Sequence, residues 1–156
     1  MRLRLFKQQK PSAEHIDIYY TDMTPRLRHI IATIEDGAPR VVGKLKSERV
    51  LLSLRDVCYV DTVDRRTFLY LQKEVYQSEM TLSAFLSAFE NEGFARINKS
   101  QVLNLHYVRR IRPTLGMRVV AVLDNGEQLI ISRSYRDQFE GSLKAWGGIP
   151  HEKMDS

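Results

Sequence analysis

The stretch Phe94-Ala95-Arg96-Ile97-Asn98-Lys99-Ser100-Gln101-Val102-Leu103-Asn104 places three polar residues between two short apolar pieces. The apolar pieces predict strands at 94–97 and 101–103, with the polar residues as the connection between them. Asn98, Lys99 and Ser100 offer amide, ammonium and hydroxyl donors, a set that suits phosphate oxygens and base edges. We therefore expect the binding partner of this chain at this connection.

Positive charge gathers around the same stretch. Residues 94–118 include six basic residues and no acidic one, whereas residues 119–156 include four basic and six acidic residues. The basic residues alternate with apolar ones, which favours a folded basic surface over a disordered tail. Together with the net charge of +5, this surface favours an anionic partner, with nucleic acid ahead of an acidic protein or a membrane surface.

The chain length and composition are typical of a small globular protein. Its 156 residues allow one domain with an appendage or two very small domains, and the hydrophobic content of 43% allows a real core. The single cysteine, Cys58, excludes an internal disulfide, and its apolar neighbours predict an inert core thiol. Residues 1–7 lack the apolar run of a signal peptide, and no window approaches the roughly 18 apolar residues of a membrane span. We expect a cytoplasmic protein.

The N-terminal residues predict a small strand-helix extension over 1–40. Residues 2–6 and 15–20 alternate in polarity, as half-exposed strands do. Thr24-Pro25 predicts a helix start, and the apolar residues that follow at helical spacing are Leu27, Ile30, Ile31 and Ile34, with Gly37 as the stop. This apolar stripe either covers the sheet of its own domain or contacts a second copy of the chain.

The remaining chain predicts a mainly β domain over 41–148 and a tail over 149–156. Regularly spaced short strands without intervening helices indicate antiparallel sheets, and they are expected at 41–45, 49–54, 57–61, 67–72, 74–77, 94–97, 101–103, 107–112, 117–123 and 128–131. Asp124-Asn125-Gly126 predicts a hairpin between the last two. Thr81 is expected to cap a short helix with an apolar face, and Ser134 to cap a last helix that ends at Gly147-Gly148.

The residues needed for catalysis or metal binding are not arranged in any recognisable motif. The histidines stand far apart, and none pairs with a cysteine or glutamate at the spacing of metal ligands. No phosphate-binding glycine loop and no G-x-S-x-G sequence occurs. Asp61 and Asp64 lie beside Arg65 and Arg66, as in a solvated loop that balances its own charge. We expect no enzyme activity, no catalytic residue, no metal, no cofactor and no small-molecule substrate.

Three polar segments interrupt the β pattern and share a composition. They are 61–67, 98–100 and 132–136, and each places arginine or lysine beside hydroxyl or amide residues at the end of a rigid element. Such segments suit a surface that touches phosphates and reads base edges. Each segment alone could be an ordinary solvated turn; the three together with the basic stretch favour binding.

Four sequence patterns, in this order and at this spacing, resemble the signature of LytTR-type DNA-binding domains of bacterial transcription regulators. They are Val57-x-Tyr59-Val60-Asp61, Phe94-x-Arg96-Ile97-Asn98-Lys99-Ser100-x-Val102-x-Asn104, Leu123-x-Asn125-Gly126 and Ile131-Ser132-Arg133-Ser134-Tyr135. The resemblance covers about residues 41–146. It implies a β-rich α+β fold of elongated antiparallel sheets with short helices, whose loops enter successive major grooves on one face of DNA.

The resemblance also implies where the contacts to double-stranded DNA lie. Carried over by position, they are Arg65, Arg66, Asn98, Lys99, Ser100, Ser132, Arg133 and Ser134. Lys99 and Arg133 would clamp phosphates or bind base edges in a bidentate manner, while Asn98 would pair with an adenine and Arg66 with a guanine or a phosphate. Many members of the family have histidine at the position of Asn98, which affects the base sequence that is preferred more than the binding itself.

Members of this family commonly carry a receiver domain ahead of the DNA-binding part, so the resemblance implies a response-regulator-like protein. The first 40 residues leave no room for such a domain and predict a stand-alone member. The strand at 15–20 and the helix after it would then serve a homodimer or a small membrane-protein regulator. Two other interpretations remain: an RNA-binding module, which the lack of an exposed aromatic pair disfavours, and a protein-interaction or small-molecule domain with an incidental basic surface.

Overall fold

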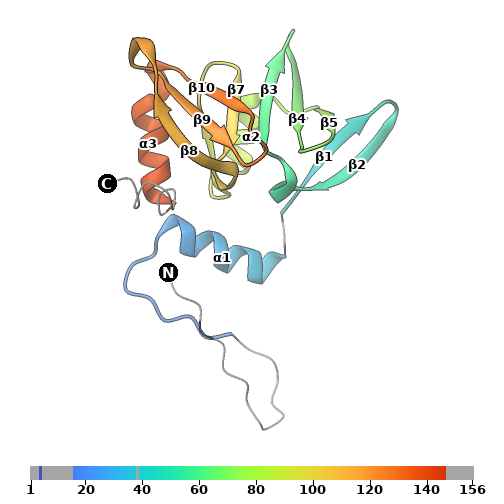
Figure 1. Cartoon of the computed structure of the whole chain (residues 1–156). Coiled ribbons are helices and arrows are strands. Elements are labelled where there is room, and N and C mark those ends of the chain that lie inside the picture. The colour runs from blue at the N-terminus through green and yellow to red at the C-terminus, as the bar shows by residue number, and fades with distance from the viewer. Residues whose placement is uncertain (1–3, 5–15, 38, 147–156) are drawn as a thin grey trace.

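Ten strands of the described chain pair into two antiparallel sheets (Figure 1). The computed structural model describes residue 4 and residues 16–37 and 39–146. The larger sheet has the strand order β2-β1-β5-β4-β3-β7-β6, and the smaller sheet has the order β10-β9-β8. This arrangement confirms the expected mainly β fold of antiparallel sheets with short helices.

The strands follow the predicted positions closely. In the larger sheet they are β1 (Arg40–Leu45), β2 (Glu48–Ser53), β3 (Tyr59–Val63), β4 (Arg66–Tyr70), β5 (Val75–Ser78), β6 (Phe94–Arg96) and β7 (Gln101–Asn104). In the smaller sheet they are β8 (Val108–Pro113), β9 (Val119–Leu123) and β10 (Gln128–Ile131). Strands β3, β5, β8 and β9 start one or two residues later than predicted. The 3₁₀ turns η1 (Leu54–Asp56) and η2 (Leu105–Tyr107) precede β3 and β8. Two further 3₁₀ turns are η3 (Leu115–Met117) and η4 (Arg133–Tyr135).

Two hydrophobic cores lie on opposite faces of strands β3 and β7. On β3, Tyr59 belongs to the core shared with the smaller sheet, whereas Val60 belongs to the core under α2 (Leu82–Ala88). On β7, Leu103 and Val102 divide in the same way. Successive side chains of a strand point to opposite faces. These central strands are therefore buried on both sides and form a rigid base for the loops that leave them.

The helices α2 and α3 (Arg136–Ala145) close the two cores. Thr81 caps α2 as predicted, because its Oγ1 accepts a hydrogen bond from the Ala84 backbone N–H at 3.0 Å. The prediction that Ser134 caps α3 is wrong. The Tyr135 N–H donates to the Ser132 carbonyl at 3.0 Å, so the chain makes one 3₁₀ turn first, and α3 begins only at Arg136.

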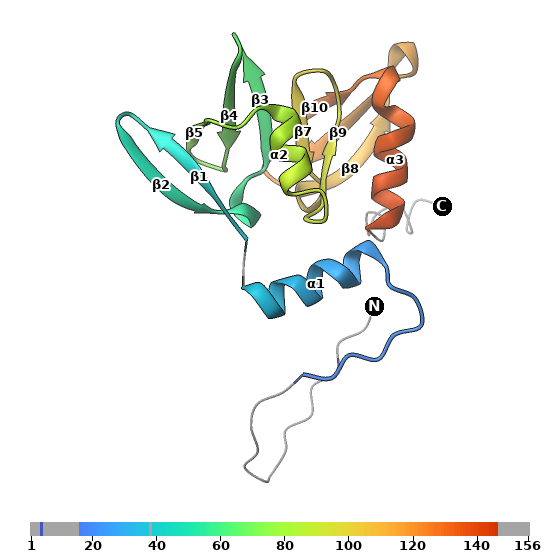
Figure 2. The same cartoon turned by 180° about the vertical axis from the view of Figure 1, so that it is seen from behind.

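The N-terminal part of the described chain lies across one end of the domain (Figures 1 and 2). Helix α1 (Pro25–Asp36) starts as predicted, with the Leu27 N–H donating to Thr24 Oγ1 at 3.1 Å. It covers neither sheet: Leu27 is buried, while Ile34 on the same stripe stays 47% exposed.

The expectations for the two ends of the chain have different outcomes. Residues 16–20 form no strand, because an alternating sequence needs a neighbouring strand to pair with, and none of the described residues supplies one. The strand expected at 2–6 lies outside the described residues except for Arg4, which forms no strand. The stop at Gly147-Gly148 and the tail over 149–156 also lie outside them.

Cys58 is expected to resist thiol reagents in the folded protein. Cys58 is 1% exposed. Burial, and to a smaller extent the nearby Glu127 carboxylate, raises the pKa of the Cys58 thiol to about 11. The neutral thiol is a poor nucleophile, so alkylation at pH 8 should be negligible in buffer and complete in denaturant. Mass spectrometry after timed alkylation measures the extent of labelling in buffer and in denaturant. Rapid labelling of the folded chain would show that this core opens readily.

Candidate nucleic-acid interface

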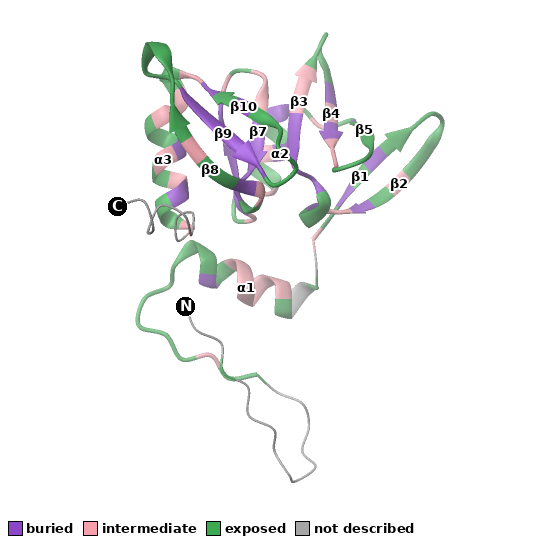
Figure 3. Cartoon of the chain, viewed as in Figure 1, coloured by how far each residue is buried: buried purple, intermediate pink, exposed green. Residues whose placement is uncertain are grey.

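The three polar segments of the sequence come together at one end of the two sheets (Figures 1 and 2). They form the β3–β4 turn, the β6–β7 loop and the junction of β10 with α3. Helix α1 lies at the opposite end of the domain. Figure 3 shows that the ends of these elements are exposed or half-buried, whereas the strands behind them are buried.

Backbone hydrogen bonds fasten the three segments to one another. The Thr62 N–H, at the end of β3, donates to the Ser100 carbonyl at 2.8 Å. The Ser132 N–H, after β10, donates to the Ile97 carbonyl at 2.9 Å. The β6–β7 loop therefore holds the other two segments on either side of itself, and all three present a single surface.

The β3–β4 turn is tighter than the sequence suggested. The polar segment 61–67 was expected between the two strands, but β3 and β4 extend into it and leave only Asp64 and Arg65 in the turn. Both residues have a positive φ, 50° for Asp64 and 64° for Arg65. Residues other than glycine adopt this conformation at a cost of about 1–3 kcal/mol. The strained turn holds Arg65 at the exposed tip of the hairpin.

Arg96 stabilises the β6–β7 loop from below. Its Nε donates to the Asn98 carbonyl at 3.2 Å, and its Nη2 donates to the Lys99 carbonyl at 2.6 Å. The guanidinium also lies 5.8 Å from the centre of the Tyr135 ring, in the third segment. The Arg96 side chain thus stabilises the loop that forms part of the surface. This agrees with the expectation, which did not include Arg96 among the DNA contacts.

The side chain of Asn98 shapes the same loop. Its Nδ2 donates to Gln101 Oε1 at 2.8 Å and to the Ile130 carbonyl at 3.2 Å. Its Oδ1 accepts from the Ser100 N–H at 2.9 Å and from the Ser100 hydroxyl at 3.1 Å. An asparagine amide has two N–H donors and two acceptor lone pairs, so Asn98 would reach an adenine only after giving up one of these bonds.

Removing the Asn98 side chain is expected to loosen the loop. Asn98→Ala leaves the Ile130 carbonyl and the Ser100 N–H without these partners, and such losses cost about 1–3 kcal/mol for a group kept from water. We expect a lower free energy of unfolding together with faster amide hydrogen exchange at Lys99 and Ser100. Hydrogen-exchange mass spectrometry measures the second effect. Unchanged exchange in this loop would mean that the backbone alone fixes its shape.

A second polar contact beneath the loop could not be found from the sequence. Gln101 Nε2 donates to Asp61 Oδ2 at 3.1 Å, while Gln101 Oε1 accepts from Asn98. Gln101 and Asp61 are opposite each other in the register of β7 and β3. The contact therefore depends on strand pairing, and the only signal in the sequence is that both residues are polar positions of strands.

Four cations of this surface have exposed side chains that make no hydrogen bond or ion pair to any described residue. They are Arg65, Arg66, Lys99 and Arg133. Lys99 lines an open depression together with Asn98, Ser132, Ser134 and Tyr135. The structure thus brings all eight of the residues predicted as contacts to one end of the domain.

Comparison with known families decides the class of this domain. A model of the LytTr DNA-binding domain family matches residues 47–144. The chain belongs to the LytTr DNA-binding domain family. The matched residues include all three segments of the surface and both sheets from the turn before β2 onward.

Individual relatives agree with the LytTr assignment. The chain is 23% identical over 145 residues to the sensory transduction protein LytT of Bacillus cereus, covering 91% of this chain and 54% of that protein. It is 27% identical over 100 residues to the transcriptional regulatory protein YpdB of Escherichia coli K12, covering 63% of this chain and 41% of that protein. The chain thus spans about half the length of these relatives.

A solved structure shares the LytTr fold. It is a LytTr DNA-binding domain from Bacillus cereus, with a TM-score of 0.63 and 22% sequence identity, covering 67% of this chain and 95% of that one. Within the described part of this chain, no group of three or more histidine, cysteine, aspartate or glutamate side chains is placed to hold a metal ion. No helix among the described residues is long and apolar enough to cross a membrane.

Proposed function

We propose that this chain is a cytoplasmic transcription regulator that binds double-stranded DNA at specific sequences and inserts its three loops into successive major grooves. The observation that carries the proposal is the joined surface: three loops tied by backbone hydrogen bonds carry four exposed, unpaired cations. Cations supply most of the attraction to the phosphates, while side chains at rigid loop ends can read base edges. Membership of the LytTr family supports the same function.

The residues proposed to contact DNA differ in whether their side chains already have hydrogen-bond partners within the protein. Lys99 and Arg133 clamp phosphates or bind guanine edges, because both are exposed and unpaired among the described residues. Arg65 and Arg66 meet the DNA from the β3–β4 hairpin, and Ser132 and Ser134 add hydroxyl contacts near the start of α3. Asn98 and Ser100 lie half-buried with their side chains bonded to each other, so we assign them mainly to holding Lys99 in place.

We propose further that the protein binds repeated half-sites as a homodimer formed through its N-terminal segment. Ile16 is 67% exposed, Tyr19 92% and Tyr20 56%, and these apolar residues precede a helix that itself exposes Ile34. A small membrane-protein regulator is the other occupant that this segment would suit. Exposed apolar side chains of this size commonly mark an interaction surface.

Aspartate substitutions in this segment are expected to separate the dimer. Burying a charge in an apolar contact is costly, so Tyr19→Asp combined with Ile16→Asp should lower the sedimenting mass of the full chain to that of one copy. Sedimentation equilibrium of both proteins measures this. An unchanged dimer would place the contact elsewhere, and a parent chain that is already monomeric would leave the segment to another partner.

Selection from random duplexes tests the DNA-binding function. The purified chain is incubated with a pool of random duplexes, and the bound DNA is amplified and tested by gel shift against a scrambled duplex and single-stranded RNA. We expect a discrete complex that resists both competitors. A complex that modest salt abolishes and that either competitor displaces would indicate a basic surface without sequence recognition.

A further inference from the structure

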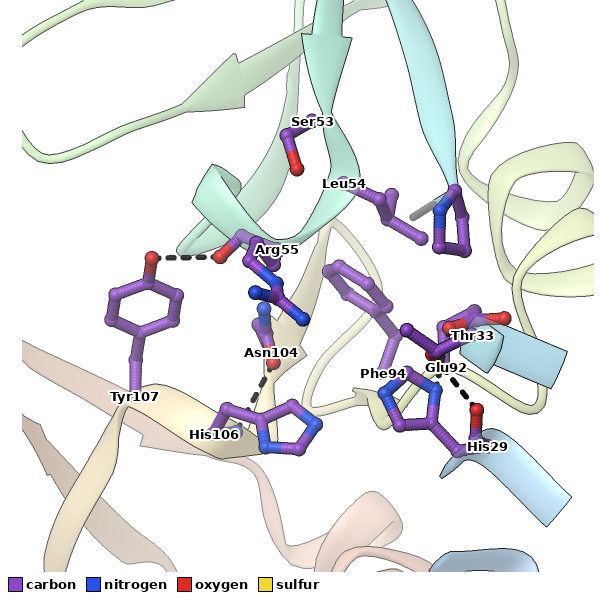
Figure 4. A pocket seen from close by; sticks show the side chains of 11 residues that line it. His29, Thr33, Ser53, Leu54, Arg55, Glu92, Phe94, Asn104, His106 and Tyr107 are labelled. Carbon is purple, nitrogen blue, oxygen red and sulfur yellow. Dashed lines mark hydrogen bonds and ion pairs between the residues drawn. The ribbon is translucent and has the colours of Figure 1, made fainter. Parts of the chain in front are cut away.

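A cavity of about 330 Å³ lies between α1 and the end of the domain that is farthest from the three loops. We propose that this cavity binds a small organic anion, a carboxylate or a phosphate monoester, through the side chains of Arg55 and His106. Figure 4 shows the side chains around the cavity, which come from elements far apart in the sequence. This site is separate from the DNA-binding surface and does not depend on it.

Polar side chains line the cavity from both α1 and the body of the domain, and apolar residues complete its lining. Helix α1 supplies His29 and Thr33, while η1 and η2 supply Arg55 and His106. The apolar residues of its lining are Pro39, Leu54 and Phe94. Small-molecule sites are concave, largely apolar and provided with a few converging polar groups, and a volume of about 300 Å³ lies at the small end of their range.

The charges of the cavity are incompletely balanced. Glu92 Oε2 lies 2.6 Å from His29 Nδ1, so the one carboxylate of the lining already faces a histidine. Among the described residues, neither the Arg55 guanidinium nor the His106 ring has a hydrogen-bond or ion-pair partner. A guanidinium presents a fork of donors that matches a carboxylate or a phosphate. The lining thus offers two groups that can donate hydrogen bonds to an anion.

Both anion-binding groups stand on fixed backbone. The Tyr107 hydroxyl donates to the Arg55 carbonyl at 2.8 Å, and the His106 N–H donates to Asn104 Oδ1 at 3.1 Å. Asn104 is itself buried and donates to the Val57 carbonyl at 2.9 Å. Gly93 has a φ of +87°, and the His106 ring lies against it. A Cβ added at Gly93 would be 3.0 Å from His106 Nε2.

The surroundings of His106 disfavour a positive charge on its ring. The pKa of His106 lies below its usual range, first because the surrounding groups displace water and then because His29, Arg26 and Arg55 disfavour a further positive charge. A neutral imidazole still offers one N–H donor. The unpaired Arg55 guanidinium would supply the positive charge and His106 a hydrogen bond, a pair of groups that suits an anion rather than a cation.

The single tryptophan of the chain provides a direct measurement of occupancy. The Trp146 ring lies edge-on to the His29 and His106 rings, with centroids 5.2 Å and 5.4 Å away. Benzoate, phenyl phosphate and benzylammonium are titrated separately into the full chain while the fluorescence of Trp146 is recorded. We expect a saturable change with benzoate or phenyl phosphate, with a Kd on the order of millimolar for ligands of this size. The stronger of the two identifies the anionic group.

Two variants with the same change in net charge complete the test. Arg55→Gln should weaken anion binding about tenfold or more, because a charge-assisted hydrogen bond is lost. Lys46→Gln, at the β1–β2 turn, should bind as the parent does. Arg55 is exposed, so its replacement is expected to leave the fold intact. A response to neither anion, an equal response to benzylammonium, or equal weakening by both variants would overturn the proposal.

Discussion

Replacing Lys99 or Arg133 by alanine is expected to weaken binding to the selected duplex by about 1–3 kcal/mol each, which is roughly 5- to 150-fold. Both side chains are exposed, and neither has an internal partner among the described residues. Their loss should therefore remove the proposed DNA contacts without disturbing the fold. Fluorescence anisotropy with a labelled duplex, repeated at several salt concentrations, measures the affinity and its salt dependence. A lost phosphate contact should lower the slope of log K against log salt by about one.

The matched control for these variants is Lys144→Ala. Lys144 is exposed near the end of α3, close to α1 and far from the three loops (Figure 1). Lys144→Ala removes the same unit of positive charge from the chain, so an effect of net charge alone would weaken DNA binding as much as Lys99→Ala or Arg133→Ala does. We expect the affinity of Lys144→Ala to match the parent. Parent-like affinity of both Lys99→Ala and Arg133→Ala would contradict the assignment of the interface.

Replacing Phe139 by alanine is expected to lower the free energy of unfolding by about 3–5 kcal/mol. Phe139 is 0% exposed and anchors α3 in the core that joins the smaller sheet to β3, β6 and β7. Truncation removes buried apolar surface and leaves a cavity that the two rigid sheets cannot easily fill. Urea unfolding followed by circular dichroism measures the change.

The same variant also bears on the interface, because α3 begins where the third loop ends. If the core around Phe139 fixes the position of η4, Phe139→Ala should also weaken DNA binding at temperatures where the chain stays folded. Gln138→Ala, on the exposed side of the same helix, should change the free energy of unfolding by less than about 0.5 kcal/mol. If Phe139→Ala lowers the free energy of unfolding by less than about 1 kcal/mol, the core repacks around the space that the ring leaves.

The sequence predicted the strands because their signals are local. Short apolar runs between polar turns mark each strand, and Asp124-Asn125-Gly126 marks the β9–β10 hairpin, where Gly126 has a φ of +87°. The 3₁₀ turns η1 and η2 escaped prediction. Leu54, which starts η1, continues the apolar pattern of the strand before it and was predicted as the end of that strand, and Leu105 lies between two predicted strands. Strand ends were therefore misplaced by a few residues while the fold class was confirmed.

The two errors in the predicted elements have different causes. Residues 16–20 alternate as a strand does, but alternation only describes which side chains could share a face and does not supply a second strand. Ser134 has the side chain of a helix cap, yet the 3₁₀ turn that starts at Ser132 delays the helix. In both places the structure depends on contacts that composition does not encode.

The types of residue at the candidate interface could be predicted from the sequence, but the hydrogen bonds that hold its loops in place could not. Basic and hydroxyl residues at three loop ends indicated the surface, and the structure places all three loops together. The bonds that hold the surface, from Arg96 to two carbonyls and from Gln101 to Asp61, depend on strand register and loop shape. The contacts to DNA themselves stay predictions.

Directed cleavage of DNA from single cysteines tests the interface most directly. The buried Cys58 leaves an added surface cysteine as the reactive thiol, so an iron chelate that cuts DNA can be attached at Val63→Cys, beside the first loop, or Asp137→Cys, beside the third. Both positions are exposed and neither is a proposed contact. We predict cuts on opposite sides of the centre of each half-site, and none from Lys144→Cys at the far end. Cuts from Lys144→Cys without cuts from the other two would contradict the account.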